Sequence, residues 1–181
     1  MRSSQSAGAD TRTDIQSEAE ALAKAKRTGE SVEIVGLRGE SSEVFATPDG
    51  DLEAREYLRP VWTRADGSWK HIDTDLVTDD GGLVAPKAST IGLEFSGGGN
   101  KAPLVRMQRA GRELSLSWPD SLPKPEITGA VATYPSVLPD VDLRMTAQED
   151  GFSQLLVVKT AEAASNPKLA KLRLDLTSQG L

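Results

Sequence analysis

The chain has 181 residues, a net charge of -6, 38% apolar and 4% aromatic side chains, and no cysteine. This length suits one domain with short appendages and is enough for a real hydrophobic core. The missing cysteine excludes disulfides, thiolate catalysis and cysteine-ligated zinc. The acidic balance argues against a nucleic-acid partner, and no apolar run approaches the roughly 20 residues of a membrane-spanning helix.

The beginning of the chain predicts a lead-in followed by a helix. Residues 1–13 are polar and without periodicity, which is typical of disorder. We expect a helix over residues 14–29, with Thr13 or Asp14 as its N-cap and Gly29 as its stop. The side chains at helical spacing are Ile15, Ala19, Leu22 and Ala23. Because this stripe is narrow and rich in alanine, the helix is expected to pack weakly or not at all on the sheet.

Residues 30–181 predict a single β-rich domain. Short runs of alternating apolar residues are separated by turn residues throughout this stretch. Asp66-Gly67 between two apolar runs is a strong hairpin signal, and Gly111 marks a second hairpin. No helix of about 10–15 residues lies between the strands, which argues against a parallel α/β fold. The fold class is therefore mainly β, an antiparallel β-sandwich-like domain with one N-terminal helix.

The charged residues give no catalytic or metal site. A lone His71, expected on a strand face with Trp69, Asp73 and Asp75, makes no common zinc site, and no GxSxG nucleophile motif accompanies it. Three Asp-x-Asp pairs lack the spacing of a calcium loop and also suit solvated turns and strands. These pairs are Asp49/Asp51, Asp73/Asp75 and Asp140/Asp142. We assign no catalytic residue, no metal ligand and no cofactor, and expect the protein not to be an enzyme.

The three tryptophans are the candidate ligand contacts. Trp62, Trp69 and Trp118 each offer a large flat face on which a sugar ring can stack. Trp62 and Trp69 flank one hairpin and are expected to sit across it. The favoured alternative is that all three are the largest parts of an aromatic-poor core. Gly97-Gly98-Gly99 lacks the Lys-Ser/Thr of a phosphate-binding loop and is interpreted as a flexible turn.

Four stretches between residues 23 and 176 carry a family resemblance. They are AKAKRTGESVEI, VWTRADGSWKHIDTDL, STIGLEFSGGG and the segment that runs from LSLSWPDSL to LAKLRLDL. Together they resemble the N-terminal β-rich region of large actinobacterial secreted proteins that continue into LamG-like jelly-roll, DNRLRE or RHS/YD-repeat segments. The resemblance implies a secreted or cell-surface module without catalytic residues. Its partner would be the remainder of a larger polypeptide or a cell-surface polymer.

Two departures from that family set the remaining expectations. The family's proteins begin with a signal peptide and run on much further, whereas this chain has no apolar leader and Ser178-Gln179-Gly180 is typical of a turn without a returning strand. We expect a piece of a larger secreted protein, truncated at its C-terminal edge; a complete chain would be cytoplasmic. The leading hypothesis is a non-catalytic structural or interaction module. A carbohydrate-binding module is the alternative, and a hydrolase is the third hypothesis.

Overall fold

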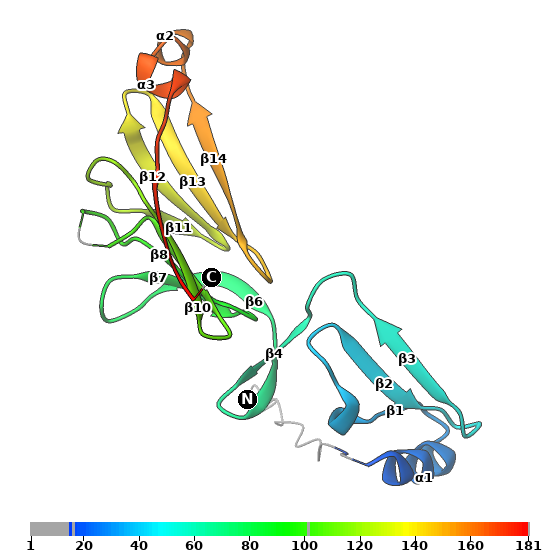
Figure 1. The fold of residues 1–181 in the computed structure, drawn as a ribbon. Coiled ribbons are helices and arrows are strands. Elements are labelled where there is room, and N and C mark those ends of the chain that lie inside the picture. The colour runs from blue at the N-terminus through cyan, green and yellow to red at the C-terminus, as the bar shows by residue number, and fades with distance from the viewer. Residues whose placement is uncertain (1–14, 16, 101, 181) are drawn as a thin grey trace, which may run out of the picture. The chain divides into compact units, whose positions relative to one another are not determined.

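The computed structural model describes residue 15, residues 17–100 and residues 102–180 (Figure 1). Its contacts divide the chain into two compact units, one ending at Leu58 and the other beginning at Arg59. Each unit has its own cluster of buried apolar side chains. The boundary therefore falls inside the stretch 30–181 for which the sequence predicts one domain. The expected lead-in, residues 1–13, lies outside the described residues.

The first unit is a helix on a small sheet. Its elements are α1 (Glu18–Thr28), β1 (Val32–Glu33), the 3-10 turn η1 (Val35–Leu37), β2 (Ser42–Ala46) and β3 (Leu52–Glu56). The strands pair antiparallel in the order β1-β2-β3, and α1 contacts β1 and β2.

Helix α1 begins later than the sequence predicts. Its N-cap is Ser17, whose side-chain oxygen accepts a hydrogen bond from the Glu20 amide. The expected caps, Thr13 and Asp14, lie outside the described residues. The predicted stop is confirmed, since Gly29 takes the left-handed conformation at φ 75° and donates its amide to the Ala25 carbonyl.

The helix segment packs through only part of the predicted stripe, since Ile15 and Leu22 do join the apolar cluster of the first unit. Ala21 and Ala25 are 0% exposed, while Ala19 and Ala23 are exposed. The expectation of weak packing is therefore wrong. Two alanines one turn apart leave a flat strip, which lets the helix backbone approach the sheet closely. The apolar side chains of the sheet and its connections in this cluster are Val32, Ile34, Val44 and Ala46.

The second unit contains the sandwich. Its strands are β4 (Trp62–Ala65), β5 (Ser68–His71), β6 (Asp73–Thr78), β7 (Val84–Ala88), β8 (Gly92–Phe95), β9 (Val105–Arg109), β10 (Arg112–Ser117), β11 (Glu126–Thr128), β12 (Val131–Leu138), β13 (Val141–Ala147), β14 (Phe152–Val158) and β15 (Asp175–Gln179). Two short helices, α2 (Ala161–Ala164) and α3 (Pro167–Ala170), precede β15. The described strands form a six-stranded sheet, β15-β10-β9-β8-β7-β6, a four-stranded sheet, β11-β12-β13-β14, and the hairpin β4-β5.

Side chains from both large sheets meet in one apolar core. The largest fully buried strand residues of this core are Phe95, Val84 and Val105 from the six-stranded sheet, and Tyr134, Leu143 and Met145 from the four-stranded sheet. The Tyr134 hydroxyl donates a hydrogen bond to the Ser96 carbonyl at 2.6 Å, so this buried polar group is satisfied. The antiparallel ladders, the sandwiched core and the N-terminal helix confirm the predicted fold class.

The two predicted hairpins are present. The β4–β5 turn places Asp66 and Gly67 at φ 55° and 79°, and the β9–β10 turn places Ala110 and Gly111 at φ 51° and 76°. Positive φ at both central residues matches the right-handed twist of the paired strands.

The alternation of Leu172, Leu174 and Leu176 predicts a last strand there, and the observed C-terminal strand lies further along the chain. Leu172 and Leu174, which the alternation assigns to a strand, instead pack against the core ahead of β15. Ser178 and Gln179 do not turn but pair with β10. Their backbone groups complete a ladder with a strand more than 60 residues earlier, which local sequence does not reveal. Only Gly180, at φ 73°, leaves extended geometry.

Candidate functional site

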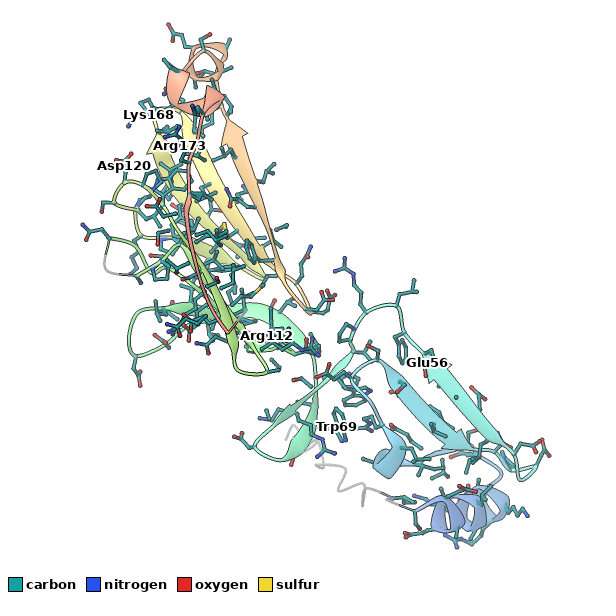
Figure 2. The ribbon with its side chains drawn as sticks, viewed as in Figure 1. Glu56, Trp69, Arg112, Asp120, Lys168 and Arg173 are labelled. Carbon is teal, nitrogen blue, oxygen red and sulfur yellow. The ribbon has the colours of Figure 1, made fainter. Side chains whose placement is uncertain are left out.

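One face of the β4–β5 hairpin gathers aromatic and basic side chains. Trp62 lies directly opposite His71, and their rings stack with centroids 3.7 Å apart. Arg64 lies opposite Trp69, with its guanidinium carbon 4.7 Å from the ring centroid. Residues two apart on a strand and residues directly opposite share a face, so all four belong to one face (Figure 2 labels Trp69). The sequence-predicted pair Trp62 and Trp69 is therefore diagonal across the hairpin.

These indole faces are already in contact with other side chains. Trp62 is 9% exposed and stacked on His71, and Trp69 is half-buried beneath Arg64. A sugar ring would have to displace Arg64 to stack on that face of Trp69. Trp118, 8% exposed, lies apart from this pair in the sandwich core. The structure thus brings two of the three candidate tryptophans together and separates the third.

His71 contacts Trp62, whereas the two acids expected beside it contact a lysine. β5 ends at His71, and β6 starts two residues later with an irregular register. Asp73 and Asp75 both reach the Lys87 ammonium, at 3.6 and 3.2 Å. Hydrogen bonding to Asp75, then the charge of Asp73, raises the pKa of Lys87. This acidic pair therefore binds a lysine, and it lies on the strand that follows the one carrying His71 and Trp69.

Asp142 is the most deeply placed carboxylate of the three Asp-x-Asp pairs. It is 8% exposed and lies 2.7 Å from the Lys159 ammonium. The same oxygen accepts the backbone amide of Ser136 at 2.8 Å, where Ser136 takes φ 52° and the β12–β13 register shifts. Lys159 and then the Ser136 amide hold the pKa of Asp142 below its ordinary value. Asp142 therefore secures an irregularity in the sheet.

Trp118 forms part of a shallow surface pocket with basic residues on its rim. The lining residues are Trp118, Pro119, Asp120, Leu138, Lys168, Lys171, Leu172 and Arg173. Lys168 pairs with Asp120 at 3.4 Å, and Figure 2 shows both beside Arg173. Three cations against one acid make this region locally positive, although the chain is acidic. Sequence reasoning missed this pocket, although three basic residues within six positions were a visible signal.

The short helix α3 brings Lys168 to the pocket. Asn166-Pro167 breaks the preceding helix as expected, since α2 ends at Ala164. The same pair also starts α3, because the Asn166 side chain accepts the Lys168 amide and Pro167 occupies the first turn. Asparagine and proline here act as start signals for a new turn.

Neither the described residues nor the comparisons with known proteins indicate a metal site, a membrane-spanning helix or a family. Within the described ranges, no three His, Cys, Asp or Glu side chains lie together so as to hold a metal ion. No helix of the described part of the chain is long and apolar enough to cross a membrane. Comparison of the chain with protein-family models, curated proteins and solved structures found no match in any of the three.

Proposed function

We propose that the chain is a non-catalytic structural or interaction module of a larger secreted or cell-surface protein. The observation that carries this proposal is that Asp142, Glu149 and His71 are each engaged with another side chain of the chain. Asp142 is paired with Lys159, and Glu149 with Arg59 at 3.0 Å. The pKa values of Asp142 and Glu149 are both lowered, the first chiefly by Lys159 and the second chiefly by its own backbone amide.

Lowered carboxylate pKa values support the non-catalytic assignment. A general acid at neutral pH needs a carboxyl whose pKa is raised toward 7, which burial without a cation produces. Here the neighbours of Asp142 and Glu149 keep both groups ionised. His71, the single histidine, is stacked on Trp62. These three side chains therefore interact with other residues of the same chain and stabilise its fold.

The two-unit organisation and the resemblance support a place in a modular protein. Each unit buries its own apolar cluster, as the domains of large surface proteins do. The stretches that resemble the actinobacterial secreted proteins occur in both units. The remainder of such a polypeptide, or a cell-surface polymer, is the partner that fits this proposal.

An antibody raised against the purified chain tests the proposal. Immunoblots of medium, cell envelope and cytosol from the native cells are expected to show a band larger than 19.3 kDa in the medium or the envelope. A band of 19.3 kDa confined to the cytosol would contradict both the larger protein and the location. Hydrolysis of a panel of chromogenic glycosides and esters by the purified chain would contradict the non-catalytic assignment.

Carbohydrate binding is the second candidate, and the Trp118 pocket is the observation that favours it. An apolar floor beneath cationic side chains suits a sugar that carries a carboxylate, because arginine binds carboxylates through paired N–H groups. Lys171 and Arg173 are both exposed at the rim. The acidic sugar would be a repeating unit of a surface polymer.

Titration with uronic-acid oligosaccharides tests this second candidate. Arg173→Ala and Lys171→Ala are each expected to weaken binding about fivefold to tenfold, the loss of one charge-assisted hydrogen bond. Arg112→Ala is the matched control, because Arg112 is exposed on β10 and lies apart from Arg173 in Figure 2. If the wild-type chain does not bind, this candidate is rejected and the structural module stands alone.

A further inference from the structure

Strand β14 is an open sheet edge without the usual protection. It is the last strand of the four-stranded sheet, as Figure 1 shows. Its seven residues, FSQLLVV, contain no charge, proline or glycine. Leu155 is 58% and Val158 40% exposed. Uncharged, regular edge strands of this kind readily pair with another strand.

The ladder with β13 shows which backbone groups of β14 are open. Lys159 donates its amide to the Asp140 carbonyl, and Gln148 donates its amide to the Gly151 carbonyl. Hydrogen-bonded pairs alternate along an antiparallel ladder, so odd-numbered residues of β14 bond to β13. The residues whose N–H and C=O groups point away from β13 are therefore Phe152, Gln154, Leu156 and Val158. No other described strand pairs with this edge.

The other edges of the sandwich have protective features that β14 lacks. β6 has an irregular register, and its Leu76 amide is bonded to the Gly129 carbonyl. β11 has only three residues. β15 is shorter than β14 and begins with a charged residue, Asp175. Bulges, short length and charge are the features by which natural sheets prevent edge pairing.

We propose that β14 pairs antiparallel with β14 of a second copy of this chain, about a two-fold axis at Leu155. In this register Phe152 lies opposite Val158 of the other copy, and Gln154 lies opposite Leu156. All four are residues with outward backbone groups, so four pairs with two bonds each make about eight hydrogen bonds between copies. Leu155 meets its own counterpart, and Ser153 meets Val157, on the outer face.

A second copy fits this edge because the strand is complementary to itself. The outward-pointing residues are symmetric about Leu155, so an identical strand satisfies every outward N–H and C=O group. The absence of charge in β14 means that no like charges are placed opposite each other. A two-fold contact of this kind is closed and gives a dimer rather than a fibre. Edge pairing buries less surface than a standard interface, so the dimer is weak and concentration-dependent.

Sedimentation of the full chain over a range of concentrations tests the dimer. The mass is expected to rise from 19.3 kDa toward twice that value as concentration increases. Leu155→Lys places two ammonium groups face to face at the axis and is expected to abolish the rise. Leu176→Lys is the matched control, because Leu176 is 61% exposed on the β15 edge and should leave the rise unchanged.

Single cysteines test the register, since the native chain has none. Leu155→Cys is expected to form a covalent dimer under mild oxidation, because opposite residues of a non-hydrogen-bonded pair have Cα atoms about 4.5 Å apart, within disulfide range. Ser153→Cys, whose counterpart would lie about 13 Å away along the strand, should form no covalent dimer. The proposal is overturned by a monomeric wild-type chain, by loss of the dimer in Leu176→Lys alone, or by equal cross-linking of both cysteine variants. A monomer would leave the edge to a strand of another protein.

Discussion

Asp142 shows how one residue ties three segments of the sandwich together. Its carboxylate accepts the Ser136 amide within the β12 irregularity and pairs with Lys159 after β14. Because the folded pKa lies below the unfolded one, the folded state binds fewer protons. This stabilisation is complete above about pH 4, the unfolded pKa, and is lost as pH falls through the lower folded pKa.

Replacing Asp142 tests this linkage. Asp142→Asn keeps an oxygen for the Ser136 amide but removes the charge that faces Lys159, so the free energy of unfolding should fall by about 1 kcal/mol at neutral pH. Urea titrations from about pH 7 to about pH 2 should show the two proteins converging at the acidic end. Asp175→Asn, at an exposed position on β15, is the control with no expected change. An undiminished difference at about pH 2 would contradict the assigned role.

Gly97 shows a packing role that its sequence context does not reveal. A Cβ atom added there would overlap the carbonyl oxygen of Gly82. Gly99 exchanges two backbone hydrogen bonds with Leu122, at 2.7 and 2.9 Å. The triple-glycine segment is therefore bonded and closely packed, and its interpretation as a flexible turn is wrong. Two distant backbones approach each other where only glycine leaves room.

Gly97→Ala is expected to lower the free energy of unfolding by about 3 kcal/mol, since rigid backbone must move to admit the methyl group. Gly151→Ala is the matched control, because its Cβ would meet nothing within 4 Å and its φ is not positive. That variant should be neutral or more stable by about 0.5 kcal/mol. Chemical denaturation measures both. Equal stabilities would show that the Gly82 contact relaxes freely.

At the scale of elements, turn chemistry in the β9–β10 hairpin is imperfect. Ala110 takes φ 51° in a two-residue turn that favours asparagine and glycine. An alanine in the left-handed region costs about 1–2 kcal/mol, because its Cβ approaches the following carbonyl oxygen. Asp66 occupies the equivalent position in the β4–β5 hairpin, where its short polar side chain tolerates this geometry.

Ala110→Asn should therefore raise the free energy of unfolding by about 0.5–1 kcal/mol. Ala110→Val should lower it, because a branched Cβ makes the same contact worse. Thermal unfolding followed by circular dichroism measures both changes. The opposite order of the two variants would show that the turn adopts another conformation in solution.

Strand β3 shows which elements pattern recognition misses. Its sequence, LEARE, has only two apolar side chains, Leu52 and Ala54, and all five residues are exposed. It forms because Ser42–Ala46 of β2 offers a free edge in register with it, across the Pro48–Asp51 turn region. Arg55 adds a contact above the Phe45 ring, at 4.1 Å. The partner strand, rather than the strand's own composition, decides that β3 exists.

At the scale of the whole molecule, the division into two units predicts that the second unit is equally stable without the first. All three tryptophans lie in the unit that begins at Arg59, so tryptophan fluorescence reports on that unit alone. Its core cluster is made of its own residues, from Leu76 to Leu174. Residues 59–181 produced alone should therefore unfold in urea within about 0.5 kcal/mol of the full chain by fluorescence. A larger shift would show that the first unit contributes to the sandwich.

The sequence by itself determined what depends on neighbouring residues. The mainly β class, the Asp66-Gly67 and Gly111 hairpins, the helix stop at Gly29 and the exclusion of thiol chemistry all rest on local geometry or composition. These features need at most a few adjacent residues to specify them.

Tertiary structure alone decided what depends on residues distant in the chain. It selected Ala21 and Ala25 as the buried face of α1, paired β15 with β10, and left β14 at an open edge. It also set Trp118 apart from the hairpin that carries Trp62. Which residues are buried, how the strands are ordered and which side chains contact each other all depend on which segments meet in the folded core. That choice is a property of the whole chain, since many local patterns are compatible with more than one partner.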